Sequence, residues 1–459
     1  MSTPFDAIII GTGQSGPSLA ERLAQTGQRV AVIERKHFGG TCVNSGCIPT
    51  KALVASAHAA QIARRAGDFG VAIGGPVTVD MKRVLERKDA IVAKGRGGVR
   101  SWMERLPNSA VYVGHARFES PRTVRVNGEL LEADRIIINT GGRAFVPPMP
   151  GLDAVPYLTN SSMLELDVLP EHLLVVGGSY IGLEFAQAYR RFGARVTVVE
   201  MADRLIPRED PDVSQAVREI VEADGVEVRL DATCISVERQ GNAISMGLTC
   251  GEGAPRVTGS HLLLAVGRRP NTDDLGLDRA GVETDAKGYI RVDDQCRTNV
   301  AGIWAMGDVN GRGAFTHTSY NDFEIVAANL IDNDPRRISD RIPCYAMFID
   351  PPLGRVGKTE QEVRDAGTRA LFAKLPMTSV KRARLRGETH GFMKVTVDAA
   401  TKRILGAAIL GDGGDEVVQA FLGVMAAGAP YTVISRGMYI HPTVAEYLPT
   451  LLGDLEPLA

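Results

Sequence analysis

The residues best suited to chemistry are two cysteines, Cys42 and Cys47, which lie five positions apart in a chain of 459 residues with only six cysteines. Their segment, Gly39 to Lys51, contains Pro49, a residue common in the first turn of a helix. Five positions rotate an ideal helix by about 500°, so the two thiols meet only where this turn is distorted, and Gly46 supplies the backbone freedom. A zinc site is disfavoured because no second Cys/His pair lies nearby at ligand spacing. The pattern predicts a redox-active pair of thiols.

A glycine-rich turn lies upstream of the cysteines. The apolar run Phe5 to Ile10 predicts a strand, and Gly11-Thr12-Gly13-Gln14-Ser15-Gly16 follows it directly. We expect a helix from about Gln14 to Gln25, whose N-terminal end would carry the pyrophosphate of a dinucleotide. A second strand, Arg29 to Ile33, is followed by Glu34, whose carboxylate can bind ribose hydroxyls. The segment therefore predicts a dinucleotide-binding unit.

The same pattern occurs again in mid-chain. Leu173 to Val176 is apolar, Gly177-Gly178-Ser179-Tyr180-Ile181-Gly182 makes the turn, and Leu183 to Phe192 predicts a helix. The strand Arg195 to Val199 ends at Glu200, and the acid lies 23 positions after the first glycine in both units (11 to 34, 177 to 200). Two such units predict two nucleotides, a flavin and a nicotinamide, between which hydride can pass. In this second unit Ser179 takes the place of the middle glycine.

Together with further motifs, these features make the chain resemble the flavoprotein disulfide reductases, the family of glutathione reductase, dihydrolipoamide dehydrogenase and mercuric reductase. The resemblance covers essentially the whole chain and is closest to a mercuric-reductase-like branch, which includes the bacterial flavoprotein that protects against reactive chlorine. The motifs that carry it are Thr140-Gly141-Gly142, Pro207 to Asp210, Gly267 to Asn271, Ile303 to Val309 and His441 to Glu446.

The resemblance implies an α/β fold with two Rossmann-like dinucleotide-binding domains and a C-terminal α+β dimerisation domain. We expect an FAD-binding domain over 1–150, completed by 265–340, an NAD(P)-binding domain over 151–264, and a dimerisation domain over 341–459. Pro147 to Gly151 is typical of a linker. A helix is predicted from about Met81 to Arg105, and alternating stretches such as Phe392 to Val397 and Ile404 to Leu410 predict an antiparallel sheet.

The family pattern also implies a chemical role for each catalytic residue. Electrons from NAD(P)H would pass through FAD to a disulfide between Cys42 and Cys47, with Cys47 nearer the flavin as a thiolate and Cys42 meeting the acceptor. Lys51 would act near the flavin with Glu184 as its ion-pair partner. His441, oriented by Glu446, would shuttle a proton in the active site of the partner subunit. The expected catalytic residues are Cys42, Cys47, His441, Glu446, Lys51 and Glu184.

The residues expected to bind the cofactors share these turns and motifs. Asp308 would bind the ribityl chain, Tyr180 would cover the nicotinamide pocket, and the helix predicted from Tyr320 to Leu330, after Thr316 to Thr318, would favour negative charge on the flavin. Glu200 favours NADH by binding a ribose hydroxyl, although Arg204 leaves NADPH open. The complete set is Gly11, Gly13, Ser15, Gly16, Glu34, Thr41, Lys51, Thr140, Gly141, Gly307, Asp308, Gly177, Tyr180, Ile181, Gly182, Glu200, Arg204 and Gly267.

Composition excludes other classes of function. A formal net charge of −2 gives no bias toward nucleic acid or anionic membranes, and the basic run Lys381 to Arg386 is typical of a solvated face. No apolar stretch reaches membrane-spanning length, so we expect a cytoplasmic protein. The other cysteines are dispersed, which suits a reducing compartment where buried thiols act as small apolar residues, and we expect none of them to be catalytic. These are Cys234, Cys250, Cys296 and Cys344.

The electron acceptor stays open at this stage. Typical mercuric reductases carry a cysteine pair near the C-terminus and a tyrosine in place of the catalytic histidine, whereas this chain ends in Gly453 to Ala459 without cysteines and keeps His441. Disulfides and soft metal ions such as Cu(II) or Hg(II) both fit, and dihydrolipoamide is an alternative. A flavin-bearing dimer that only binds is the non-enzymatic alternative, which the intact redox motif disfavours.

Overall fold

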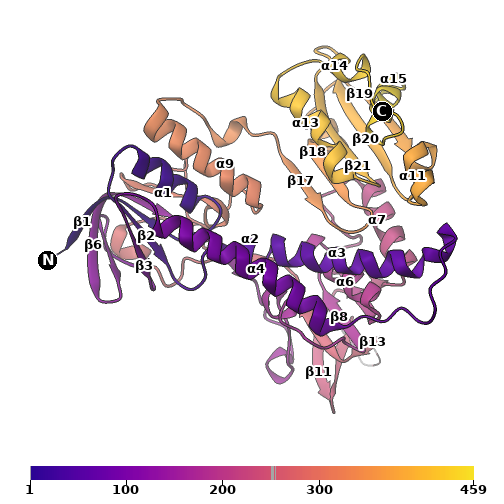
Figure 1. Cartoon of the computed structure of the whole chain (residues 1–459), viewed down its shortest axis with the longest axis horizontal. Coiled ribbons are helices and arrows are strands. Elements are labelled where there is room, and N and C mark those ends of the chain that lie inside the picture. The colour runs from indigo at the N-terminus through magenta and orange to yellow at the C-terminus, as the bar shows by residue number, and fades with distance from the viewer. Residues whose placement is uncertain (1, 250–252, 254, 459) are drawn as a thin grey trace.

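The computed structural model describes residues 2–249, 253 and 255–458. The first sheet has the order β3-β2-β1-β6-β5-β4, and β16 pairs with the end of β6. Strands β1, β2, β3, β6 and β16 are parallel, and the inner ones are buried apolar runs because helices cover the sheet. Helices α1 and α9 lie together on one side of it (Figure 1). The bounds are β1 Thr3–Ile10, α1 Gly16–Gln25, β2 Val30–Glu34, β3 Ser109–Val113, β4 Arg117–Ser120, β5 Thr123–Val126, β6 Glu129–Ile138, α8 Leu277–Ala280, β16 Ile303–Ala305 and α9 Thr316–Ala327.

The second sheet is a parallel one with the order β10-β9-β8-β14, and a three-stranded antiparallel sheet, β11-β12-β13, stands beside it. Every residue of β8 is buried, as are most of β9 and β14. The bounds are α5 Asn160–Met163, β8 His172–Val176, α6 Tyr180–Phe192, β9 Arg195–Val199, α7 Pro211–Ala223, β10 Glu227–Arg229, β11 Ser236–Gln240, β12 Ala243–Gly247, β13 Arg256–Gly259 and β14 His261–Leu264.

The third sheet is antiparallel, with the order β17-β18-β21-β20-β19-β22, and forms the C-terminal body at the top of Figure 1. Its central strands are almost entirely buried beneath α13 and α15. The bounds are β17 Cys344–Met347, β18 Leu353–Gly357, α10 Glu360–Asp365, β19 Ala370–Pro376, α11 Lys381–Arg386, β20 Phe392–Asp398, β21 Ile404–Leu410, α12 Gly414–Val417, α13 Gln419–Ala426, α14 Thr432–Ser435, α15 Leu448–Gly453 and β22 Glu456–Pro457.

Each of these sheets, with its helices, forms one body of the molecule, and three segments connect the three bodies. Helix α2 (Gly40–Asn44) is followed by α3 (Cys47–Arg64), which runs beneath the third sheet, and α4 (Met81–Glu104) crosses from the first body to the second (Figure 1). A two-stranded ribbon, β7 (Gly142–Ala144) with β15 (Arg268–Pro270), joins the chain where it leaves and re-enters the first body. The redox cysteines therefore lie where all three bodies approach one another.

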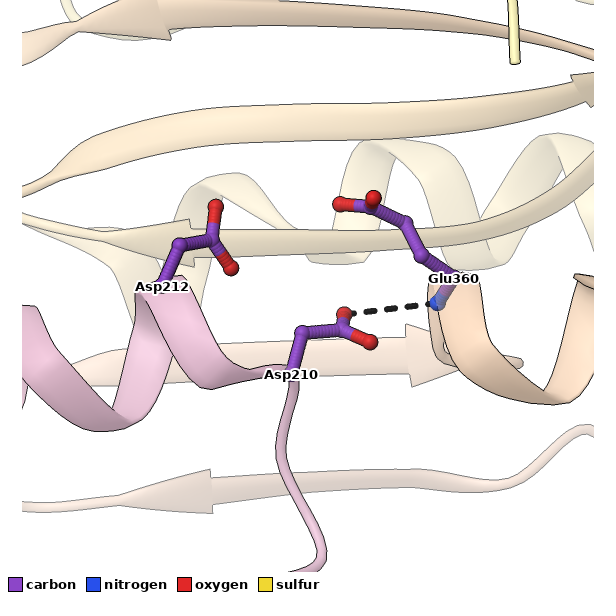
Figure 2. A group of neighbouring side chains, drawn as sticks. All are labelled: Asp210, Asp212 and Glu360. Atoms are coloured by element: carbon purple, nitrogen blue, oxygen red, sulfur yellow. Dashed lines mark hydrogen bonds between the residues drawn. The ribbon is translucent and has the colours of Figure 1, made fainter. Parts of the chain in front are cut away.

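A buried ion network ties the second body to the third. Figure 2 shows the carboxylates of Asp210, Asp212 and Glu360 close together, a grouping that could hold a metal ion. The ammonium group of Lys394 already fills this place, because its Nζ lies 2.8, 2.7 and 2.6 Å from the three carboxylates. Arg355, which is almost fully buried, adds a further contact to Asp210 at 3.1 Å. The cluster is an interdomain lock of paired charges rather than a metal site.

Several predicted bounds were wrong by a few residues. Helix α1 begins at Gly16 rather than Gln14, α6 begins at Tyr180 rather than Leu183, and α9 begins at Thr316 rather than Tyr320 and ends at Ala327. The early start of α9 comes from polar residues in its first turn, which an apolar period does not report, whereas α6 begins inside the glycine turn itself, directly after its N-cap residue Ser179. In the described chain no helix is long and apolar enough to cross a membrane.

The expectation for the dispersed cysteines needs one correction. Cys296 is buried among apolar side chains and Cys344 is half-buried, and both are free thiols, as expected. Cys234, in contrast, is disulfide-bonded. Cys250 lies outside the described residues.

Candidate active site

One cavity of about 860 Å³ joins the glycine turn of the first sheet to the two cysteines and to the edge of the third sheet. Its walls come from the first body, from the start of α6, from the start of α9 and from β17. The predicted site residues that line it are Gly11, Gly13, Glu34, Thr41, Cys42, Cys47, Lys51, Thr140, Gly141, Tyr180, Ile181, Glu184 and Asp308. The predicted residues outside its lining are Ser15, Gly16, Gly177, Gly182, Glu200, Arg204, Gly267, Gly307, His441 and Glu446.

The two cysteines lie in separate helices, because the chain breaks between α2, which holds Cys42, and α3, which begins at Cys47. A side chain at Gly46 would place its Cβ 2.9 Å from the carbonyl oxygen of Thr41, so only glycine permits this close return. The distorted turn predicted from the spacing is therefore a break between two helices. Both thiols are free, so the structure describes the dithiol form.

The two thiols have opposite acidities. A hydrogen bond from Cys42, the hydroxyl of Thr316 and the charge of Lys51 lower the pKa of Cys47 to about 6. The same thiol–thiol hydrogen bond and burial raise the pKa of Cys42 above its usual range. Thr316 Oγ1 lies 3.0 Å from Cys47 Sγ, at the first residue of α9. At neutral pH the pair therefore carries a thiolate on Cys47 and a proton on Cys42.

Lys51 and Glu184 form the ion pair predicted from the sequence. Lys51 Nζ donates to the two carboxylate oxygens of Glu184 at 2.9 and 2.7 Å, and the carboxylate is nearly fully buried. Glu184 also accepts from the backbone N–H of Phe348 at 2.9 Å, and the Lys51 ammonium lies 4.4 Å from the centre of the Phe348 ring. These contacts hold the Lys51 charge in the cavity one helical turn from Cys47.

The glycine turn of the first body, with β1, α1 and β2, forms the first nucleotide unit (residues 3–34). Gly11 has φ +107°, and a Cβ there would overlap the carbonyl oxygen of Asn139. Glu34 accepts from Thr12 N at 3.0 Å and from Thr12 Oγ1 at 2.6 Å, which brings its carboxylate to the turn. Ser15 is fully buried and donates to Asn139 Oδ1 at 2.8 Å. This cradle of backbone N–H groups and one carboxylate fits the pyrophosphate and ribose of FAD.

The second nucleotide unit (residues 172–200) repeats this backbone. Gly177 has φ +113°, and Gly182 lies so close to the Gly177 carbonyl that a Cβ would overlap it. Glu200 accepts from Gly178 N at 2.6 Å and from Ala202 N at 2.9 Å. Ser179, in the place of the middle glycine, is the N-cap residue of α6 and is extended, so its side chain does not require a left-handed backbone. The unit fits a second dinucleotide.

The remaining predicted cofactor residues lie at the joint between the bodies. Gly307, with φ +73°, begins a 3₁₀ turn that includes Asp308, and burial raises the pKa of the Asp308 carboxyl. Arg268 Nε lies 3.5 Å from Asp308. Tyr180 packs against Phe315, with ring centres 5.6 Å apart, and so covers the cavity from the second body. Gly141 and Gly267 flank the β7–β15 ribbon with positive φ.

His441 and Glu446 form a pair at the far end of the chain. His441 Nδ1 lies 2.8 Å from Glu446 Oε2, and the imidazole is 63% exposed. Neither residue is part of the described wall of the cavity in its own chain. The exposed neighbours Met438 and Ile440 form an apolar surface next to His441. The His441–Glu446 hydrogen bond is thus formed within one chain, but the imidazole is exposed to solvent.

Comparison with known proteins agrees with this geometry. The family profile of pyridine nucleotide-disulphide oxidoreductases matches residues 5–322, and that of their dimerisation domain matches residues 344–452. The chain belongs to the pyridine nucleotide-disulphide oxidoreductase family. It is thus a flavoprotein oxidoreductase with a C-terminal dimerisation domain, and the predicted fold class is confirmed.

Individual relatives match along the whole chain. The probable pyridine nucleotide-disulfide oxidoreductase RclA of Escherichia coli (strain K12) is 37% identical, with 98% of this chain and 99% of the relative covered. The mercuric reductase of Streptomyces lividans is 34% identical, with 97% and 95% covered. The solved Cu(II) complex of the HOCl-induced flavoprotein disulfide reductase RclA from Escherichia coli superposes with a TM-score of 0.89 at 35% identity, covering 98% and 100%. The predicted branch of the family is confirmed.

Sequence reasoning missed three residues that shape the site. Thr316 was noticed only as part of the segment before a predicted helix, yet its hydroxyl lies 3.0 Å from Cys47 Sγ. Asn139 supports the first glycine turn through Ser15 and through a bond to the Gly11 carbonyl at 3.2 Å. Asn160 reaches the segment between the cysteines from the second body. Asn139 directly precedes the Thr140-Gly141-Gly142 motif, which was a signal for it, but nothing local pointed to the contacts of the other two.

Proposed function

We propose that this chain passes electrons from NADH through FAD to the Cys42–Cys47 pair, and from there to a disulfide or a soft metal ion. The observation that carries the proposal is the stabilised Cys47 thiolate, held by Thr316 and Lys51 in the cavity of the first nucleotide unit. FAD, when bound, supplies the two-electron relay between a nicotinamide and a disulfide. Gly11, Glu34 and Asp308 would hold it, and Lys51 would supply positive charge beside it.

Glu200 supports NADH over NADPH. Its carboxylate is fixed by the N–H groups of Gly178 and Ala202 at the end of β9, where a ribose 2′-hydroxyl would donate to it and a 2′-phosphate would be repelled. Arg204, the residue that left NADPH open, donates to the Pro207 carbonyl at 3.2 Å. Steady-state kinetics with both nucleotides test this assignment, and a larger specificity constant for NADPH would contradict it.

The outward-facing His441 supports a homodimer with a shared active site. The exposed imidazole lies outside the described wall of its own chain's cavity, whereas in a homodimer it would lie beside Cys42 of the other chain. There it would hold the proton that a leaving thiolate needs, and Glu446 would stabilise its protonated form.

Two acceptor classes fit the Cys42 thiol. Thiolates attack disulfides by exchange and are also good ligands for soft metal ions. The names of the relatives include a mercuric reductase and a Cu(II) complex, which supports trying metal ions, whereas the His441–Glu446 pair supports a disulfide. Turnover should be compared for lipoamide, glutathione disulfide, other small disulfides, Cu(II) and Hg(II). A yellow dimer that turns over none of them would support a binding role instead.

Replacing His441 separates the two classes. Reduction of a disulfide releases a thiolate that must be protonated, but electron transfer to a thiolate-bound metal ion does not need that proton. His441→Ala should therefore slow disulfide reduction by about 10²–10⁴-fold, with little change in metal reduction or in flavin reduction by NADH. Equal losses with all acceptors would indicate a damaged dimer, and no loss with the best disulfide would remove His441 from the mechanism.

A further inference from the structure

The segment between the two cysteines (residues 42–47, the redox segment) is held by side chains from outside it. Asn160 Nδ2 donates to the carbonyl oxygen of Ser45 at 2.7 Å. Asn160 opens helix α5 beside the second sheet, next to a bridge between Leu158 and Leu263, and its side chain is buried. A residue of the second body thus donates a hydrogen bond to the backbone between the two thiols.

A second hydrogen bond to the redox segment comes from α4. Arg96 Nε donates to Asn44 Oδ1 at 2.7 Å. The Asn44 amide nitrogen donates in turn to the carbonyl oxygens of Phe38, at 2.9 Å, and Gly40, at 2.8 Å. Arg96 therefore holds the Asn44 side chain, which bonds back to the start of α2, the helix that carries Cys42.

Neither Asn160 nor Arg96 contacts a thiol, but their hydrogen bonds order the backbone that joins the two thiols. The structure describes the dithiol form, in which nothing covalent joins Cys42 to Cys47. Forming the disulfide from the Cys47 thiolate and the Cys42 thiol creates one S–S bond, releases one proton and passes two electrons to an oxidant such as an acceptor disulfide. This closure costs less when the backbone is already ordered, because the loop entropy is lost before the bond forms. Hydrogen bonds that order the dithiol segment should therefore shift the balance toward the disulfide.

We propose that Asn160 and Arg96 are positioning residues that stabilise the Cys42–Cys47 disulfide relative to the dithiol by holding the redox segment compact. The inference rests on the proposed redox role of the two cysteines. Because Asn160 belongs to the second body and Arg96 to the first, two bodies of the molecule set the reducing power of the pair together.

The test is the equilibrium between dithiol and disulfide in the FAD-containing protein. Holoenzyme is equilibrated in oxidised and reduced dithiothreitol at several ratios, free thiols are trapped by alkylation, and the peptide with Cys42 and Cys47 is quantified by mass spectrometry. Asn160→Ala and Arg96→Met should each shift the equilibrium toward the dithiol by about threefold to tenfold, because the freed dithiol segment regains part of the backbone entropy that one residue loses on ordering. This shift corresponds to about 15–30 mV toward a less negative potential.

Matched variants control for general effects. Ser161→Ala changes the exposed neighbour of Asn160, and Arg100→Met removes an exposed arginine of α4 that pairs with Glu104 on the surface. Both should titrate like the unchanged protein. Arg96→Lys, which keeps a donor, should recover part of the shift. If Asn160→Ala does not fold, Arg96→Met decides the question alone.

The outcomes separate the two levels of the proposal. If Asn160→Ala and Arg96→Met have the same dithiol–disulfide potential as the unchanged protein, the positioning role is overturned. A shift of the equilibrium toward the disulfide would overturn it as well. If the unchanged protein forms no reducible Cys42–Cys47 disulfide at all, the proposed function fails rather than the role of these two residues.

Discussion

The first and second nucleotide units have the same backbone conformation at their glycine turns but differ in which segments of the chain pack on those turns. In both, a glycine with positive φ begins the turn, a second glycine five positions on packs against its carbonyl, and an acid from the next strand bonds back to the turn. The first unit is then covered: a Cβ on Gly40 of α2 would lie 2.6 Å from Gly13 Cα, and Ser15 lies 3.1 Å from Ser319 of α9. The second turn is packed by the loop that follows its own acid instead: a Cβ on Gly178 would lie 2.6 Å from Leu205 Cδ2, and Ile206 N donates to the Gly178 carbonyl at 2.9 Å.

This difference suggests how a repeated unit takes on two tasks. The first unit is bound by contacts from α2, α9 and Asn139, which suits a cofactor that stays in place. The second unit reaches the cavity only through the start of α6, at Tyr180, Ile181, Glu184 and Phe185, which suits a nucleotide that enters and leaves.

The largest expected effect comes from filling the first glycine of each turn. Gly11→Ala would force a side chain onto the Asn139 carbonyl at φ +107°, so the purified protein should lose its flavin. Gly177→Ala, with φ +113°, should keep the flavin but lose about 10²-fold or more in the rate of flavin reduction by NADH. The flavin-to-protein absorbance ratio and stopped-flow reduction measure the two effects. Equal flavin loss in both variants would contradict separate tasks.

A smaller effect is expected from the two acids. Glu200→Gln removes the charge that would repel a 2′-phosphate, so the preference for NADH over NADPH should fall by about tenfold. Glu34→Gln, the matched change in the first unit, should weaken flavin retention and leave the nucleotide preference unchanged. The ratio of specificity constants for the two nucleotides decides the matter, and a changed ratio in Glu34→Gln would show that the units are not specialised in this way.

The smallest effect concerns the thiolate beside the first unit. Thr316→Val removes a hydrogen bond that lowers the pKa of Cys47 from the ordinary thiol value, so that pKa should rise. The charged form of a thiol exists above its pKa, and thiolate absorbance should therefore appear at higher pH than in the unchanged protein, where it appears as pH rises through about 6. An unchanged titration would remove Thr316 from the account.

Patterns that are local in sequence predicted most of the fold. Both glycine turns, the strands around them and β21 follow from a few adjacent residues, and β21 has the predicted bounds, Ile404–Leu410. Contacts between distant segments were beyond such patterns: Thr316 is 269 positions from Cys47, and Asn160 is 115 from Ser45. Side chains that meet only after three bodies assemble leave no period or spacing in the sequence. The Lys51–Glu184 pair was an exception because a family motif carried it.

Anaerobic mixing of the purified protein with NADH tests the central claim most directly. If electrons pass from the second unit through the first to the cysteines, flavin reduction should be followed by a long-wavelength charge-transfer band, which reports a Cys47 thiolate beside oxidised flavin. Cys47→Ser should keep its flavin and accept electrons from NADH but show no band. A band that persists in Cys47→Ser, or no band in the unchanged protein above pH 6, where the thiolate is expected, would contradict the account.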